Sequence, residues 1–241
     1  MFREHPAASA WFGLQPGTAV SFARNLVPLS LSTSVEFLSL GPTSDPSPVW
    51  RHKVMRVLDL GCGSGRESIR WGVTASDEVI GIDIDESRVA VARERFPERT
   101  YLHGAGESLP FANETFDRVV SSLALPYMNI QKALAEIHRV LVPGGSVSLS
   151  LHLPSFTLSE FLHPSIPLMK ATLFRLYVMA NGIWFHCSGR TFVLLGKTES
   201  FQTKRGMKIA LTRAGFSHFS FTRAPAPRGG KLVVEARKST F

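Results

Sequence analysis

Short apolar runs rich in β-branched residues alternate with stretches of helical periodicity from Val54 to the end of the chain. This alternation is typical of βαβ units, which build a parallel sheet with helices packed against it. We therefore expect an α/β fold: a doubly wound, Rossmann-like, mostly parallel sheet of seven strands with helices on both faces. The predicted strands are Val54–Leu60, Glu78–Ile84, Thr100–His103, Phe116–Ser121, Ser146–His152, Phe216–Thr222 and Lys231–Ala236.

Caps and stop signals define three helices between these strands. Asp85 caps the first helix and Pro97 stops it, whereas Asn129 caps the second and Pro143-Gly144-Gly145 stops it. Gly215 closes the third helix. Their buried faces should carry Val89, Ala92 and Phe96; Ala133, Leu134, Ile137, Val140 and Leu141; and Met207, Ala210, Leu211 and Ala214.

Residues 153–200 interrupt the alternation with large apolar side chains, so we expect a helical insertion after the fifth strand. Asn181-Gly182 is expected to end its helix. This helix either covers the sheet as part of the core or forms a lid over an apolar acceptor. Its apolar stripe should be Ile166, Met169, Leu173, Leu176 and Met179 or Ala180.

The length of 241 residues, 44% of them hydrophobic, predicts one substantial core. We assign the core to residues 51–152 and 201–241. The N-terminal segment, residues 1–50, has no βαβ pattern, and we interpret it as a cover for the substrate site.

The formal charge of +8 comes from scattered basic residues and fits either an ordinary basic enzyme surface or an acidic partner. Cys62 and Cys187 do not have the spacing of metal ligands or of a disulfide framework, so we predict no metal site and a reducing, cytoplasmic location. The serine-rich N-terminus also fits an organelle transit peptide. Charged and polar groups interrupt Ile166–Cys187, so no transmembrane helix is predicted.

A glycine-rich turn follows the first strand, with glycine at positions 61, 63 and 65. Alternate glycines allow a sharp backbone turn and a close approach of a ligand. A dinucleotide fingerprint would place its third glycine one residue later, where Arg66 stands, and a P-loop would need a lysine after the turn. The alternative interpretation is a tight strand-to-helix turn without a ligand.

Asp83 ends the second predicted strand. A carboxylate at this edge can accept hydrogen bonds from both hydroxyls of a ribose. Asp85 is the competing acid, but it is better placed as a helix cap, and capping is also the alternative role for Asp83.

The segment from Val57 to Gly65, VLDLGCGSG, resembles the first motif of the class I S-adenosylmethionine-dependent methyltransferases, an acid followed by GxGxG. Residues 104–128 are similar to a stretch common in the small-molecule methyltransferases of the ubiquinone and menaquinone type. The resemblance covers about residues 54–152 and 200–238. It implies a methyltransferase with S-adenosylmethionine as cofactor and a small, apolar or aromatic methyl acceptor.

The resemblance also assigns cofactor contacts. Ile84 would pack on the adenine, Gly106 and Glu107 would border it, and Ser121–Leu123 would border the methionine part. The full predicted cofactor set is Asp59, Gly61, Cys62, Gly63, Gly65, Asp83, Ile84, Gly106, Glu107, Ser121, Ser122 and Leu123.

Two positions depart from the family pattern. Ala105 stands where relatives usually have an aspartate that accepts from the adenine amino group, and Glu107 is the nearest substitute. Pro126 replaces a histidine that many relatives have. Both departures favour an alternative interpretation, a non-catalytic subunit that binds the cofactor and assists a true methyltransferase.

His152 is the candidate general base, because it ends the fifth strand at the ligand-binding edge. A lone histidine is more often structural. The positive charge also leaves open an RNA or protein methyltransferase, although the sequence has no basic arm with interleaved aromatics and nucleic acid is disfavoured as a partner. The oligomeric state and the methylated atom are left undetermined.

Overall fold

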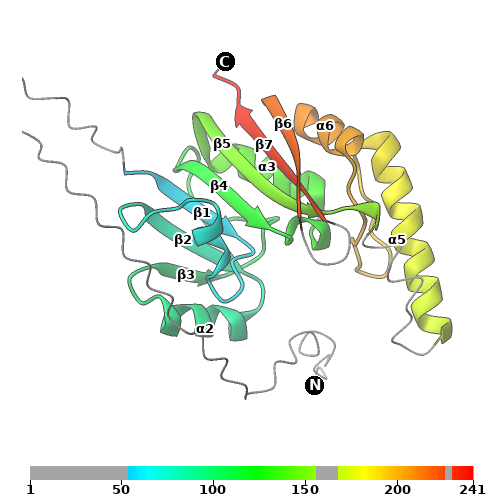
Figure 1. The fold of residues 1–241 in the computed structure, drawn as a ribbon, viewed down its shortest axis with the longest axis horizontal. Helices are drawn as coiled ribbons and strands as arrows, with labels where there is room; N and C mark the ends of the chain where they lie inside the picture. Colours follow the sequence, from blue (N-terminus) through cyan, green and yellow to red (C-terminus); the bar gives the residue numbers. More distant parts are fainter. Residues whose placement is uncertain (1–53, 156–167, 226–229, 241) are drawn as a thin grey trace, which may run out of the picture. The chain divides into compact units, whose positions relative to one another are not determined.

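The computed structural model describes residues 54–155, 168–225 and 230–240. The segment proposed as a substrate-site cover, residues 1–50, lies outside them. The described residues form a seven-stranded sheet in the order β3-β2-β1-β4-β5-β7-β6 (Figure 1). Only β7 runs antiparallel to its neighbours. The predicted fold class is therefore confirmed.

The strands lie within two residues of their predicted bounds, except that β5 begins five residues earlier than predicted. The bounds are β1 Arg56–Leu60, β2 Glu78–Asp83, β3 Thr100–His103, β4 Phe116–Ser122, β5 Leu141–His152, β6 Phe216–Ala224 and β7 Lys231–Lys238.

Helices cover both faces of the sheet. On one face, Leu58, Leu60 and Val119 pack with the helices α3, Ile130–Val140, and α6, Lys204–Arg213. On the other face, Cys62 and Tyr101 pack with α2, Glu86–Arg95, through the buried Val89 and Ala92. The short α1, Glu67–Arg70, and the 3-10 helix η1, Leu125–Tyr127, follow β1 and β4.

The predicted caps are confirmed. Asp85 accepts hydrogen bonds from the backbone N–H groups of Ser87 and Arg88 at the start of α2. Asn129 accepts from the N–H of Lys132 at the start of α3. Gly215, with φ +90°, follows the cap residue at the end of α6.

The predicted stop signal of α3 is wrong, although the helix ends close to the expected position. The helix ends at Val140, and Pro143-Gly144-Gly145 lies inside β5. Leu141 already pairs with Phe116 of β4, and the ladder then shifts register before Arg118. Gly144 has φ +75°, so the motif makes an irregularity within the strand rather than ending the helix.

The predicted stripe and end of the insertion helix are also wrong. The helix α5, Leu168–Ser188, continues through Asn181 and Gly182. Leu173 is 66% exposed and Leu176 is 54% exposed, so these members of the predicted stripe face outward, whereas Ile166 lies outside the described residues. The buried side of α5 carries Tyr177, Asn181, Gly182 and Phe185.

Tertiary contacts explain this difference. Gly182 leaves room for the ring of Phe201, since a Cβ there would lie 2.3 Å from that ring, and Phe185 packs against Gly206 of α6. Figure 1 shows α5 in yellow beside α6. None of the helices in the described residues is long and apolar enough to cross a membrane.

Candidate functional site

The glycine-rich turn follows β1 and is hydrogen-bonded to the end of β2. The backbone N–H groups of Gly61 and Cys62 donate to the Ile82 carbonyl at 2.8 and 3.1 Å. All three glycines have positive φ: +71° at Gly61, +51° at Gly63 and +82° at Gly65. A side chain is strained in this region of φ, so the backbone itself requires glycine.

The three glycines differ in the space available for a side chain. A Cβ at Gly61 would lie 2.1 Å from the Cβ of Ala124, and one at Gly65 would lie 2.7 Å from the Tyr101 hydroxyl. At Gly63 the nearest atom would be Nη1 of Arg88, at 4.0 Å. Gly61 and Gly65 are thus packed against protein, whereas Gly63 leaves an open surface that a ligand can approach.

Asp83 joins this turn to the carboxyl end of β2. Its Oδ2 accepts from the N–H of Gly63 at 2.8 Å, and its Oδ1 accepts from the N–H of Asp85 at 3.0 Å. A carboxylate offers about four acceptor positions, so two remain for further donors. Because Asp85 caps α2, Asp83 is not the capping residue.

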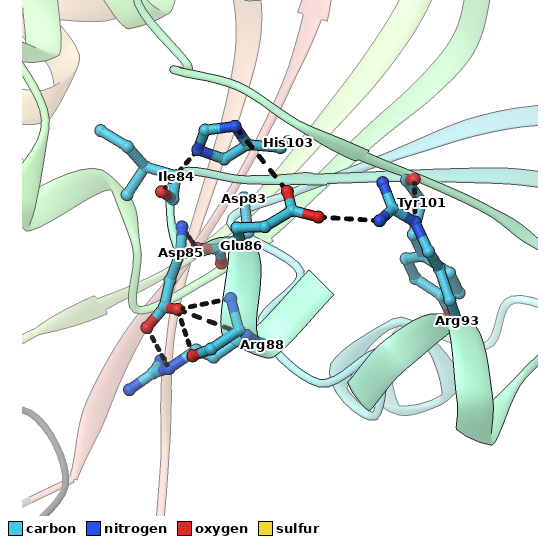
Figure 2. A network of polar contacts seen from close by, with 9 residues as sticks. Asp83, Ile84, Asp85, Glu86, Arg88, Arg93, Tyr101 and His103 are labelled. Carbon is cyan, nitrogen blue, oxygen red and sulfur yellow. Dashed lines mark hydrogen bonds and ion pairs between the residues drawn. The ribbon is translucent and has the colours of Figure 1, made fainter. Parts of the chain in front are cut away.

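The end of β3 is fixed beside Asp83. Gly104 donates its N–H to the Asp83 carbonyl at 2.9 Å. Nε2 of His103 lies 3.0 Å from the Ile84 carbonyl oxygen, and Nδ1 lies 3.7 Å from the Glu86 carboxylate (Figure 2). The Ile84 side chain is 72% exposed, an uncommon position for a large apolar group. It offers an apolar surface next to Asp83.

Glu86 also bonds to Arg93, and this pair anchors α2 to β3. Nη1 of Arg93 lies 2.8 Å from Glu86 Oε1, and its Nε donates to the Tyr101 carbonyl at 3.0 Å (Figure 2). The ends of β2 and β3 and the start of α2 are therefore held together by polar contacts.

Asp59 and Cys62 are both buried near the turn. Burial raises the pKa of the Cys62 thiol well above its ordinary value, and the negative charges of Asp59 and Asp83 raise it further. Cys62 therefore stays a neutral thiol and does not act as a nucleophile at neutral pH.

Gly106 and Glu107 lie between β3 and α3. A Cβ at Gly106 would lie 2.7 Å from Sδ of Met128, so a larger residue there would displace the Met128 side chain. Oε1 of Glu107 accepts from the N–H of Asn129 at 2.8 Å. Glu107 thus has a structural contact at the start of α3, which the sequence pattern did not predict.

The end of β4 contains two unusual features. Ser121 is buried, and its Oγ has no hydrogen-bond partner among the described residues. Leu123 has φ +58°, and its N–H donates to the Ser150 carbonyl of β5 at 2.8 Å. A buried unpartnered hydroxyl and a non-glycine residue in the left-handed region are both frequent at ligand sites. Ser122 between them is half-buried.

His152 ends β5, half-buried. Its ring centroid lies 6.3 Å from that of Tyr127 in an edge-to-face arrangement. Burial lowers the pKa of His152, and the charge of Lys231 lowers it further. The imidazole is therefore neutral at neutral pH.

These contacts place the glycine-rich turn and the carboxyl ends of β2 and β3 at one edge of the sheet. Ala124 lies at the same edge. Ala124 and Met128, on either side of η1, were not predicted as part of this edge. Met128 approaches both Gly61 and Gly106, with Cε 3.7 Å from a Cβ at the former. A short 3-10 segment has no periodic signal by which the sequence could reveal such contacts.

Comparison with known proteins gives consistent matches. The pattern of the methyltransferase domain family matches residues 58–149. A demethylmenaquinone methyltransferase of Staphylococcus aureus is 30% identical over 187 residues, which are 70% of this chain and 74% of that protein. A malonyl-[acyl-carrier protein] O-methyltransferase of Erwinia pyrifoliae is 42% identical over 97 residues, 40% of this chain and 37% of that protein.

A solved structure agrees with the fold. A methyltransferase dependent on S-adenosylmethionine from Methanosarcina mazei superposes with a TM-score of 0.55 at 20% identity, covering 78% of this chain and 94% of that chain. This likeness shows the fold alone. The chain spans less than half the length of several other curated relatives that it matches.

Proposed function

Since this chain belongs to the class I S-adenosylmethionine-dependent methyltransferase family, we propose that it transfers a methyl group from S-adenosylmethionine to a small organic acceptor. We propose an apolar or aromatic acceptor and a cytoplasmic location. The Staphylococcus aureus and Erwinia pyrifoliae relatives are named for small acceptors or for a carrier-bound one, which supports a small molecule over RNA or protein.

One observation carries this proposal: the Asp83 carboxylate is held by two backbone N–H groups beside the open surface of Gly63. The two N–H donors fix the carboxylate and leave acceptor positions for ribose hydroxyls. Ile84 offers an exposed apolar surface to an adenine ring. These residues fit the sugar and base of the cofactor.

We assign the rest of the cofactor along the same edge. Gly106 and Glu107 would border the adenine, and Ser121–Leu123 would border the methionine part. The unpartnered Ser121 hydroxyl supports this placement, because a polar ligand group would satisfy it. Asp59, Gly61, Cys62 and Gly65 would shape the turn from within rather than contact the ligand through polar atoms.

When bound, S-adenosylmethionine supplies an electrophilic methyl group on a sulfonium sulfur. The task of the chain is to hold the acceptor atom in line with that group, since positioning alone contributes several kcal/mol to such a reaction. We propose that neutral His152 takes the proton that an oxygen or carbon acceptor releases.

We place the acceptor beside residues 153–200, which enter directly from the carboxyl end of β5. Tyr127 contributes an exposed aromatic ring near His152. Thr198 donates its hydroxyl to the Tyr127 carbonyl at 2.9 Å and so joins the insertion to this edge. We propose that an apolar or aromatic acceptor packs against the exposed Tyr127 ring.

The test is methyl transfer from labelled S-adenosylmethionine into a cell extract that is then separated into small molecules, RNA and protein. The proposal expects label in the small-molecule fraction with the wild-type chain. Label in RNA, or label in protein that is not released when carrier thioesters are cleaved, would refute the small acceptor. Binding of the cofactor without transfer into any fraction would favour a non-catalytic partner subunit, the alternative suggested by Ala105 and Pro126.

A further inference from the structure

An exposed apolar stripe runs along the outer side of α5. Three of its side chains, Leu173, Ile183 and Trp184, are 66%, 57% and 52% exposed. At 3.6 residues per turn the members of the stripe fall within an arc of about 100°. Its members are Leu173, Leu176, Ala180, Ile183, Trp184 and Cys187, all of them exposed.

A second exposed apolar group, the apolar tip, is formed by residues 192–195. These four consecutive residues are Phe192, Val193, Leu194 and Leu195, with exposures of 39%, 54%, 50% and 94%. Leu194 and Lys197 exchange backbone hydrogen bonds of 3.0 and 2.9 Å, so the tip is a tight turn. A run of four exposed apolar residues is unfavourable in water unless it has a function.

The tip is fixed to the buried side of α5 by polar contacts and lies beside one edge of the stripe, because Tyr177 is only about 20° around the helix from Trp184. Nδ2 of Asn181 donates to the carbonyls of Phe192, Thr198 and Glu199 at 3.0 to 3.2 Å. Its Oδ1 accepts from the Phe192 N–H at 3.0 Å. The Tyr177 hydroxyl donates to the Phe192 carbonyl at 3.0 Å. The helix therefore holds the tip in place through buried side chains.

The segment that carries this surface is basic. Between Glu160 and Glu199 the sequence contains no aspartate or glutamate, but it contains Lys170, Arg175, Arg190 and Lys197. Arg190 and Lys197 are exposed, and neither pairs with an acid within the described part of the chain. The surface thus combines exposed aliphatic and aromatic side chains with two exposed cations, Arg190 and Lys197.

We infer that the α5 stripe and the apolar tip form a docking surface for a bilayer that carries anionic lipid headgroups. Apolar and aromatic groups flanked by cations are the composition of helices that lie in a membrane interface, where lipid tails cover the apolar side and anionic headgroups pair with the cations. The surface is independent of methyl transfer, and its test needs no acceptor.

Two other occupants fit less well. A second copy of this surface would bring Arg190 and Lys197 near the same two cations of the first copy, so self-association through the surface is disfavoured. Insertion across the bilayer is disfavoured because α5 carries Arg175, Asn181 and His186.

The experiment is cosedimentation of the full chain with vesicles of phosphatidylcholine alone and of phosphatidylcholine containing about one third phosphatidylglycerol, a strongly anionic surface. We expect binding to the anionic vesicles that weakens with salt. Ile183→Glu and Leu195→Glu should each weaken it about tenfold or more, because an apolar contact is lost and a like charge is added. Replacing Arg190 and Lys197 with serine should cost about fivefold for each cation.

Ile69→Glu is the matched control, since Ile69 is 54% exposed on α1, close to the 57% of Ile183. It should bind vesicles like the wild type. Thermal unfolding of each variant checks that the fold is retained, and Leu195→Glu stands on its own if Ile183→Glu fails to fold.

Four results would overturn the inference: no binding by the wild type, equal binding to neutral and anionic vesicles, equal loss with Ile69→Glu, or a wild-type dimer that Ile183→Glu converts to a monomer. The last result would assign the surface to contact between copies of the chain.

Discussion

Alanine substitutions at three glycines with positive φ can distinguish a glycine that contacts the ligand from one that is needed for packing. Gly61, Gly63 and Gly72 have φ of +71°, +51° and +69°. Gly63→Ala and Gly72→Ala place a Cβ in open space, so each should cost only the left-handed strain of about 1–2 kcal/mol. For a domain of this size that lowers the melting temperature by roughly 2–8 °C. Gly61→Ala adds overlap with Ala124, for a total of about 2–5 kcal/mol.

Urea unfolding measures these costs, and calorimetric titration with S-adenosylmethionine measures the function. Gly63→Ala and Gly72→Ala should be equally stable, but only Gly63→Ala should weaken cofactor binding, by about tenfold or more. The reasoning is refuted if Gly63→Ala binds the cofactor like Gly72→Ala, or if Gly61→Ala is no less stable than these two.

Three further predictions concern titratable groups. The hydrogen bond from Arg139 lowers the pKa of Glu136, so Glu136→Gln should lower the free energy of unfolding by about 1.5–3 kcal/mol at neutral pH. As the pH falls through the lowered pKa, the wild type loses this contribution, and the urea midpoints of the variant and the wild type should converge. His152→Gln should slow methyl transfer about 10²–10⁴-fold without weakening cofactor binding. Lys231→Met removes a charge that lowers the pKa of His152, so it should move the acid limb of the kcat–pH profile to higher pH. Iodoacetamide should modify the exposed Cys187 in the folded protein and Cys62 only after unfolding, as read by peptide mass spectrometry.

Local signals predicted the fold well where strand, turn and helix follow each other closely. The segments from Arg56 to Ser122 have strong β-branched runs and clear caps such as Asp85, so their elements fall within two residues of the predictions. Pro143-Gly144-Gly145 failed as a stop signal because pairing between Leu141 and Phe116 had already begun the strand. Pairing of this kind depends on a distant segment, which local patterns do not contain.

The end and the buried side of the insertion helix were predicted wrongly for a similar reason. Asn181-Gly182 is typical of a helix end, but here the amide of Asn181 binds the carbonyls of residues 192–199 and Gly182 admits the ring of Phe201. An apolar helix with two apolar sides gives a pattern that fits either side as core. The sequence therefore predicted the outward stripe, with Leu173 and Leu176, as the buried one.

The sequence predicted the part of the site that one short motif forms. It did not predict the part that depends on tertiary contacts. The glycines of the turn and Asp83 follow from spacing, and the structure brings Gly63 and Asp83 within hydrogen-bond distance. The positive φ of Leu123, the contact of Glu107 with Asn129 and the approach of Ala124 to Gly61 need neighbours from other elements.

The most direct test of the account is the affinity for S-adenosylmethionine of the wild type, Asp83→Asn and Asp77→Asn. Asp77 is the matched control, because it also accepts two backbone N–H groups, at 3.2 Å from Met55 and at 2.8 Å from Thr74. The account predicts that the wild type and Asp77→Asn bind alike, and that Asp83→Asn binds about 10–150-fold more weakly, the loss for a charged hydrogen bond of about 1.5–3 kcal/mol. No binding by the wild type, or equal binding by Asp83→Asn, would contradict it.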